Sequence, residues 1–245
     1  MDGSGQASGT ERRVAIITGG SQGIGAGLVA AYRQQGWAVV ANARTMGPPP
    51  ADPEVVTVAG DISQPATADL VMGTALGRFG RVDTLVNNAG VYVSKPFTDY
   101  TANDYALVTG VNLDGFFWLT QLAIANMLAR GRGHVVTIGA SVAEYPVSAE
   151  PSVMASLTKG GLAAATKALA VEYASRGIRV NAVAPGLIQT PLRAPEDYAA
   201  LADRLPPLGR IGQVSDIVDS ILYLESASFV TGQVLYVDGG HSAGH

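Results

Sequence analysis

Short apolar runs and longer amphipathic stretches alternate along most of the chain. The first four apolar runs are VAIIT, AVVANA, VVTVA and TLVNN. Alanine-rich stretches with apolar residues at helical spacing lie between them, such as GIGAGLVAAYRQQG and PATADLVMGTALGRF. Apolar runs without polar alternation are typical of strands that are buried on both faces. The pattern therefore predicts an α/β fold of the doubly wound type, with a parallel sheet and right-handed crossovers.

The second half of the chain continues this rhythm with longer helices. Helical stretches are predicted from about residue 103 to 130 and from about 152 to 176, with the strand-like run HVVTIG between them. The run RVNAVA, the helical run QVSDIVDSILYLE and the strand-like run VLYV follow. A segment rich in proline and charge interrupts the rhythm at about 190–210, and we interpret it as an inserted substrate loop.

A single folded domain is expected over residues 13–245. The chain has 245 residues, of which 47% are apolar and 15% charged, and this is enough for one large core. Residues 1–12 are small, polar and glycine-rich, so we interpret them as a disordered leader or an expression remnant.

Composition and charge narrow the possible chemistry. The absence of cysteine excludes thiolate catalysis, and the scattered His134, His241 and His245 lack the spacing of metal ligands. A net charge of -4 with interspersed signs offers no basic stripe for nucleic acid. No run of about eighteen uncharged apolar residues occurs, and the N-terminus lacks the order of a signal peptide. We expect a cytoplasmic protein with a small-molecule ligand and no metal, nucleic-acid or membrane partner.

The first functional motif is TGGSQGIG, between the first predicted strand and the first predicted helix. Glycines at positions 19, 23 and 25 allow a tight turn, and they let backbone N–H groups at the helix N-terminus approach a pyrophosphate. Glycine spacing alone would equally suit a packed turn. The position of the motif in the first βα unit favours a dinucleotide site.

The end of the second predicted strand indicates which dinucleotide is bound. An acidic residue there would accept hydrogen bonds from the adenosine ribose, but Ala43 occupies that place and Arg44 follows. An arginine suits a 2′-phosphate better. We therefore predict NADP as the cofactor, with NADPH favoured over NADH, although Arg44 could also be an ordinary solvated loop residue.

Together these motifs resemble the short-chain dehydrogenase/reductase family over residues 13–240. The resemblance is carried by TGGSQGIG, by GDI at 60–62, NNAG at 87–90 and VNLDG at 111–115, and by RVNAVAPGLIQTPL and DGG near the end. It implies a Rossmann-type, seven-stranded parallel sheet with helices on both faces. It also implies a bound nicotinamide dinucleotide and a homo-oligomer, a tetramer or a dimer, built on the two long helices.

The same resemblance assigns the cofactor site. Asp61 would meet the adenine, Asn88 and Gly90 would line the adenosine side, and Ile188 and Thr190 would hold the nicotinamide carboxamide. The full predicted set is Gly19, Ser21, Gly23, Ile24, Gly25, Arg44, Asp61, Ile62, Asn88, Gly90, Lys159, Pro185, Gly186, Ile188 and Thr190.

The family's chemistry uses a tyrosine, a lysine, a serine and an asparagine. The lysine lowers the phenol pKa and binds the nicotinamide ribose, the serine orients the carbonyl, and the asparagine sustains a water relay. Lys159 matches through TKGGL and Asn112 through VNLDG. Ser141 follows the strand HVVTIG, but it lies fourteen residues before Ala155 where thirteen is usual, so Val142 is the alternative occupant of the serine position.

The tyrosine is absent from its expected place. Counting back from Lys159 by the family spacing reaches Ala155, and one further back reaches Met154, and neither can donate a proton. Loss of the whole acid function would raise the barrier by roughly 3 to 5 kcal/mol, because general acid catalysis is typically worth about 10²- to 10⁴-fold.

Three interpretations follow from this replacement. In the first, hydride transfer continues with a proton from Tyr145 in SVAEY, or less favourably from Glu144, Lys159 or an ordered water. Tyr145 could equally be a half-buried loop aromatic that only packs. In the second, the substrate needs no tyrosine, because it is an iminium or a conjugated enone. In the third, the protein binds NADP(H) without turnover, as a sensor or a partner subunit.

The sequence thus predicts an NADP-dependent oxidoreductase that reduces a carbonyl, C=N or C=C group with a non-standard proton source. The predicted catalytic residues are Ser141, Lys159, Asn112 and Tyr145. A catalytically degenerate NADP(H)-binding protein is the alternative.

Overall fold

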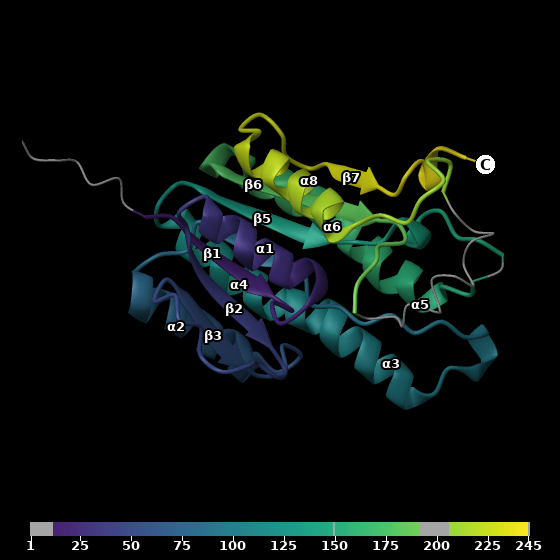
Figure 1. Cartoon of the computed structure of the whole chain (residues 1–245), viewed down its shortest axis with the longest axis horizontal. Coiled ribbons are helices and arrows are strands. Elements are labelled where there is room, and N and C mark those ends of the chain that lie inside the picture. Colours follow the sequence, from purple (N-terminus) through teal and green to yellow (C-terminus); the bar gives the residue numbers. More distant parts are fainter. Residues whose placement is uncertain (1–11, 149, 192–205, 245) are drawn as a thin grey trace, which may run out of the picture.

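The computed structural model describes residues 12–148, 150–191 and 206–244 (Figure 1). All but the last residue of the predicted leader, and most of the predicted substrate loop at 190–210, lie outside the described residues. Within them the predicted alternation of strands and helices is present.

The core of the fold is a seven-stranded sheet with the strand order β3-β2-β1-β4-β5-β6-β7. Every neighbouring pair is parallel, which confirms the predicted doubly wound fold. The strands are β1 (Val14–Thr18), β2 (Ala38–Ala43), β3 (Val55–Ala59), β4 (Thr84–Asn87), β5 (Gly133–Ile138), β6 (Ile178–Pro185) and β7 (Val234–Val237). The order reverses between β1 and β4, and ligands of such sheets bind outside the carboxyl ends of the strands at this point.

Helices cover both faces of the sheet. Successive side chains along each strand point to opposite faces of the sheet. Ile16 and Leu85 point into one core, and Ile17 and Val86 point into the other. Figure 1 shows α1 and α8 together on one face. The α-helices are α1 (Gly23–Gln34), α2 (Pro65–Phe79), α3 (Ala102–Thr109), α4 (Gly115–Leu128), α5 (Val153–Ala155), α6 (Gly161–Tyr173) and α8 (Val214–Ser226).

Two π-helical turns interrupt the long helices near the predicted site. Gly110–Asp114 joins α3 to α4, and Ser156–Gly160 joins α5 to α6. The first joined helix, Ala102–Leu128, is long and apolar enough to cross a membrane by length and composition alone. Its α4 part packs against the sheet through Leu119, Ala123 and Met127, so we interpret it as a core helix.

A buried polar cluster lies at the amino ends of β4 and β5, away from the predicted site. Glu225 of α8 accepts hydrogen bonds at Oε2 from Tyr32 (3.1 Å), Thr84 (2.9 Å) and Nδ1 of His134 (3.1 Å). Nε2 of His134 faces the Asn181 amide nitrogen at 3.1 Å, and that nitrogen is a donor. His134 therefore carries its single proton on Nδ1 and is neutral.

Burial lowers the pKa of His134 from its ordinary value of 6.5, against the opposing effect of Glu225. The pKa of His134 is lower in the folded protein than in the unfolded chain. Its full contribution to stability is therefore present only above the pKa of the unfolded chain. That stability is lost as the pH falls below about 6.5, because the unfolded chain takes up a proton first.

We predict that the free energy of unfolding decreases between pH 6.5 and 5.5 by up to about 1.4 kcal/mol per pH unit through His134. Urea unfolding at several pH values measures this slope. The variant His134→Gln should be less stable at pH 7.5 but show a flatter pH dependence in this window. An unchanged slope in the variant would contradict the assignment.

Candidate active site and dinucleotide site

The turn between β1 and α1 has the backbone that the glycine motif predicts. Gly19 and Gly23 adopt left-handed conformations with φ of +67° and +54°, which other residues rarely accept. A Cβ on Gly25 would collide with the carbonyl oxygen of Gly19. Ser21 is exposed in this turn, and Ile24 packs against the core from the first turn of α1. The turn leaves the N-terminus of α1 open to an anion.

The segment after β4 is tied to this turn by Asn88. Its amide nitrogen donates to the carbonyl oxygens of Thr18 (2.8 Å) and Gly19 (3.2 Å). The Thr18 hydroxyl accepts in return from the backbone N–H groups of Asn88 (3.0 Å) and Ala89 (2.9 Å). Asn88 therefore holds the glycine turn in place through its side chain. Its predicted contact with the adenosine remains a prediction.

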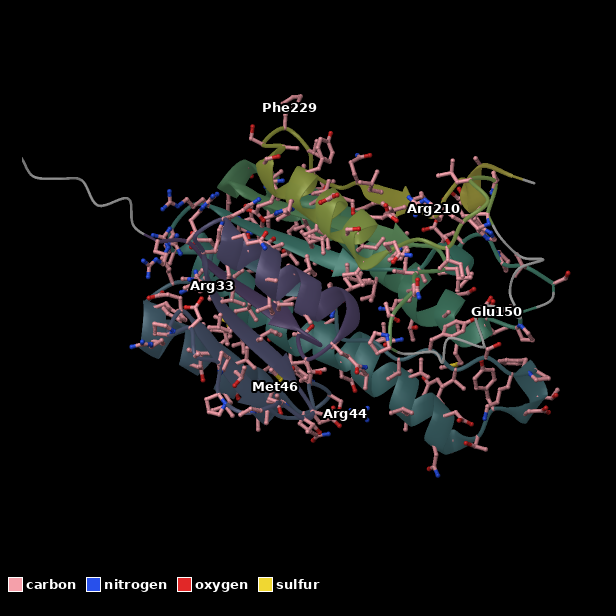
Figure 2. The ribbon with its side chains drawn as sticks, viewed as in Figure 1. Arg33, Arg44, Met46, Glu150, Arg210 and Phe229 are labelled. Atoms are coloured by element: carbon pink, nitrogen blue, oxygen red, sulfur yellow. The ribbon has the colours of Figure 1, made fainter. Side chains whose placement is uncertain are left out.

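The predicted adenosine end lies at the carboxyl ends of β2 and β3. Arg44 follows β2 directly and is exposed, and Figure 2 shows it at this edge of the sheet. Asp61 is also exposed, and its carboxylate accepts a hydrogen bond from the Ser63 backbone at 3.0 Å. Ile62 is buried against Gly115 of α4. Arg44 and Asp61 are thus open to a ligand, whereas Ile62 contributes packing.

The predicted nicotinamide side begins after β6. The N–H of Gly186 donates to the carbonyl of Val237 at 3.1 Å, and a Cβ on Gly186 would lie 2.8 Å from the Cα of Asp238. Pro185 is the last residue of β6, and Ile188 forms an isolated bridge with Gly212.

Thr190 connects this segment to the glycine turn. Its side chain would lie 3.4 Å from a Cβ on Gly23. The predicted nicotinamide segment therefore lies next to the predicted pyrophosphate turn.

Lys159 lies at the centre of the site, in the π-helical turn after α5. Its Nζ donates to the carbonyl of Ile138, the last residue of β5, at 2.7 Å. A Cβ on Gly90 would lie 3.0 Å from the same Nζ, so glycine lets the loop after β4 lie close to the lysine without displacing its ammonium group. Burial lowers the pKa of Lys159 to about 8.

Asn112 holds the same loop from the other side. Its Oδ1 accepts from the Val91 N–H at 2.9 Å, and its Nδ2 donates to the Val91 carbonyl at 3.1 Å and to Oγ1 of Thr158 at 3.1 Å. Asn112 lies in the π turn between α3 and α4, and its side chain bonds two neighbouring segments of the chain.

A cavity of about 10 Å³ lies beneath Lys159 and Asn112. Thr137 of β5 lines it, and within the described part of the chain its buried hydroxyl has no hydrogen-bond partner. The space suffices for roughly one water molecule, which needs polar neighbours of this kind. The other polar side chains that line it are Thr18 and Asn87.

Ser141 begins a 3₁₀ turn directly after β5, and Val142 is the next residue of that turn. The Ser141 hydroxyl is buried and makes no hydrogen bond among the described residues. Ala155 and Met154 are buried in α5, with 5% and 2% of their surfaces exposed. This turn of helix therefore presents no proton donor from these two positions.

Tyr145 lies close to Ser141 and against a residue that the sequence did not indicate. Its N–H donates to the Ser141 carbonyl at 2.9 Å, and its ring meets that of Tyr236 edge to face at 5.2 Å. Burial and the Glu144 carboxylate raise the pKa of Tyr236 well above its ordinary value. His241 Nε2 lies 2.9 Å from the Tyr145 carbonyl oxygen.

The loop after β4 also contacts the segment before α5. The Tyr92 hydroxyl donates to Glu150 at 2.8 Å, and the Ser94 hydroxyl donates to the Pro151 carbonyl at 2.9 Å. Figure 2 shows Glu150 far from Arg44, beyond the carboxyl ends of the strands.

Comparisons with known proteins agree with this geometry. The family model described as enoyl-(acyl carrier protein) reductase matches residues 19–242. The 3beta-hydroxysteroid dehydrogenase 1 of Eggerthella lenta is 36% identical over 247 residues, which cover 93% of each chain.

Solved structures are similar over almost the whole chain. The 3-ketoacyl-(acyl-carrier-protein) reductase of Brucella melitensis complexed with NADH has a TM-score of 0.85 and 31% identity, and the match covers 95% of this chain and 99% of that one. A tyrosine-to-phenylalanine variant of ElxO with NADPH bound has a TM-score of 0.87 and 26% identity, with 95% and 100% covered. The glycine turn, the lysine and the asparagine stand in an oxidoreductase framework whose relatives bind nicotinamide dinucleotides, and the chain belongs to the short-chain dehydrogenase/reductase family.

Proposed function

We propose that this protein is an NADP(H)-dependent oxidoreductase that reduces a carbonyl, C=N or C=C group of a small organic substrate with a non-standard proton source. The observation that supports this proposal most is the junction of Gly90, Asn112 and Lys159 beside the open glycine turn. When bound, the reduced nicotinamide supplies a hydride. The chain's own residues bind the dinucleotide, orient the acceptor and manage the proton.

Each residue of the junction has a defined task in this proposal. The Lys159 ammonium would hold the nicotinamide ribose, and Asn112 keeps the loop at Gly90 in place through the backbone of Val91. The Ser141 hydroxyl, buried without a partner among the described residues, donates to the substrate oxygen or nitrogen. A buried hydroxyl costs about 1–3 kcal/mol when it has no partner, so a ligand atom at this place would recover that energy.

The preference for NADP rests on Arg44. Arg44 is exposed directly after β2, the strand that pairs with β1. Ala43, the last residue of β2, offers no carboxylate to a ribose hydroxyl. A planar guanidinium binds phosphate oxygens in pairs, which favours the 2′-phosphate.

Tyr145 is the proposed proton source in place of Ala155. It follows Ser141 by four residues, is bonded to it through the backbone, and has 41% of its surface exposed. The other possible sources are Glu144, Lys159 and a water in the cavity below the lysine. Substrates that need no acid, such as an iminium or an enone, would make all of them dispensable.

A catalytically degenerate NADP(H)-binding protein, acting as a sensor or a partner subunit, is the second candidate function. It is favoured by the buried methyl of Ala155 where the family has its acid. It leaves unexplained why the chain retains Lys159, and why the Ser141 hydroxyl is buried without a hydrogen-bond partner among the described residues.

We further propose a cytoplasmic homo-oligomer, a dimer or a tetramer. Apolar side chains are exposed along the two long helical segments, at Phe117 (52%), Leu157 (57%) and Val171 (84%). A second copy of the chain would cover this surface, as the family resemblance implies.

The substitution Arg44→Ala should weaken NADPH binding by roughly tenfold to a hundredfold and leave NADH binding nearly unchanged, because only NADPH carries the 2′-phosphate. Fluorescence titration of both cofactors measures this effect. Native protein that binds NADH at least as tightly as NADPH would rule out the role given to Arg44.

The activity itself is tested by the loss of NADPH absorbance with a panel of ketones, quinones, cyclic imines and enones, with the variant Ala155→Tyr assayed in parallel. We expect turnover by the native protein, and the type of substrate shows whether an acid is needed. Near-ultraviolet circular dichroism checks that the variant is folded, because position 155 is buried. Tight NADPH binding with activity only in the variant would instead support the degenerate binding protein.

The substitution Tyr145→Phe should reduce turnover at least about a hundredfold with nicotinamide binding unchanged, because it removes the proton and keeps the ring. The matched control is Tyr92→Phe, which removes a tyrosine–glutamate hydrogen bond from the neighbouring loop. A small effect of Tyr145→Phe would remove this residue from the mechanism.

A further inference from the structure

We propose that Thr158 is a positioning residue for the cofactor, because its hydroxyl joins the π turn that carries Lys159 to the side chain of Asn112. This link fixes the Lys159 ammonium against the loop at Gly90. Thr158 itself does not touch the cofactor and acts only through these neighbours. The proposal rests on the proposed function, because it takes Lys159 as the group that holds the nicotinamide ribose.

Thr158 lies in the π turn Ser156–Gly160, one residue before Lys159, and it is fully buried. Its Oγ1 donates a hydrogen bond to the carbonyl oxygen of Met154 at 2.7 Å. The same Oγ1 accepts a hydrogen bond from Nδ2 of Asn112 at 3.1 Å, and Asn112 lies in the other π turn. One hydroxyl therefore connects the two π turns beside the site.

The link depends on the hydroxyl group and not on the shape of the side chain. A threonine hydroxyl has one proton, and the Met154 carbonyl takes it, because a carbonyl oxygen can only accept. The Thr158 oxygen is then left as an acceptor, so the Asn112 side chain must present its NH₂ group to it. A valine of the same shape would leave one N–H of the buried Asn112 amide without this partner.

The orientation of the Asn112 amide determines how it holds the loop after β4. Its Nδ2 also donates to the Val91 carbonyl at 3.1 Å, and its Oδ1 accepts from the Val91 N–H at 2.9 Å. An amide turned by half a rotation would place a donor against the Val91 N–H. The bond to Thr158 is thus one of three hydrogen bonds that keep the amide in the orientation that Val91 requires.

The side chains of Lys159 and Asn112 both approach the loop at Gly90. A Cβ on Gly90 would lie 3.0 Å from Nζ of Lys159 and 3.5 Å from Oδ1 of Asn112. The lysine Nζ also donates to the Ile138 carbonyl at 2.7 Å, so the ammonium lies between a strand end and this loop. Because Thr158 directly precedes Lys159, its bond to Asn112 sets the backbone of the lysine relative to the loop that the ammonium faces.

Thr166 offers a comparison within the same chain, because it makes the same local bond without the link. It is also fully buried, and its Oγ1 donates to the Leu162 carbonyl, four residues earlier, at 2.9 Å. Such bonds are common for threonine in helices. Within the described residues the Thr166 side chain has no hydrogen bond to a second element. A purely local role would make the two threonines equivalent, whereas a positioning role requires that they differ.

Matched substitutions separate these two roles. Thr158→Val and Thr166→Val each remove one buried hydroxyl and its bond to the carbonyl four residues earlier, but only Thr158→Val also removes the bond to Asn112. Thr158→Ser keeps the hydroxyl and is the rescue variant. If circular dichroism shows that Thr158→Val is unfolded, Thr158→Ala and Thr166→Ala replace the pair, because alanine has a high helix propensity.

The link is tested first in the cofactor-free protein by hydrogen–deuterium exchange, with mass spectrometry of a peptide that spans residues 88–94. Thr158→Val should accelerate exchange in this peptide roughly tenfold, because the Val91 N–H loses a fixed partner and opens more often. Exchange should stay native-like in Thr158→Ser and in Thr166→Val. Native-like exchange in Thr158→Val, or equal acceleration in Thr166→Val, overturns the proposal.

The effect on the cofactor is tested by calorimetric titration with NADPH and with ADP, which has the adenosine and two phosphates but no nicotinamide ribose. Thr158→Val should weaken NADPH binding roughly tenfold and leave ADP binding unchanged, because only NADPH carries the ribose that the Lys159 ammonium would hold. Thr158→Ser and Thr166→Val should bind both ligands as the native protein does. Equal weakening of NADPH and ADP in Thr158→Val would indicate a merely structural role and overturns the proposal.

The variant Lys159→Met separates a failure of this proposal from a failure of the proposed function, because it removes the ammonium and keeps an unbranched side chain. Weakened NADPH binding in Lys159→Met with native-like binding in Thr158→Val overturns the positioning role of Thr158 and leaves the proposed function intact. Native-like NADPH binding in Lys159→Met overturns the ribose contact and the positioning role together. A native protein that binds neither NADPH nor NADH overturns the proposed function as well.

Discussion

The site depends on how closely the loop after β4 approaches Lys159. Gly90 is the residue of closest approach, since a Cβ there would lie 3.0 Å from the lysine Nζ. Asn112 maintains this approach, because its side chain satisfies both backbone groups of Val91, the next residue. The lysine in turn donates to the end of β5. A short loop, a strand end and a helix turn are thus fixed against each other by one amide and one ammonium group.

The same loop also connects Lys159 to the glycine turn between β1 and α1. Its first part is held by Asn88, whose amide bridges the carbonyl oxygens of Thr18 and Gly19. Its later part is held at Val91 by Asn112. Four residues therefore connect the turn suited to a pyrophosphate with the lysine suited to a ribose. Each end of this segment is thus held by side-chain hydrogen bonds to the element beside it.

The fold could be predicted from the sequence because its elements have local signals. Unbroken apolar runs identified the strands, helical spacing identified the helices that cover the sheet, and the glycine spacing located the turn after β1. Arg44 and Lys159 could be located along the chain for the same reason, because Arg44 follows a predicted strand and Lys159 lies within a predicted helical stretch.

The neighbours of the reacting groups could not be found in this way. Tyr236 contacts Tyr145, which lies 91 positions earlier in the chain. The alternation of side chains along β7 predicts only the face of the sheet to which Tyr236 points. The bond from Tyr92 to Glu150 likewise joins two loops without a period of their own. For Asn112, the motif predicted the residue but not its partners, because these depend on how two π turns pack together. Pairings of this kind are set by tertiary packing and leave no local trace.

Solvent access separates the tyrosine–glutamate pairs of this protein. At the amino ends of the strands, Glu225 is enclosed with Tyr32 and His134, and each proton has a fixed place. This cluster stabilises the fold at neutral pH, because water does not compete for its hydrogen bonds. At the carboxyl ends, Glu144 is exposed, and its carboxylate contributes to the raised pKa of Tyr236. Water competes for that carboxylate, so the same two kinds of group do not form a structural bond there. The exposed pair lies instead beside Tyr145, in a site whose helix carries alanine at the family's acid position.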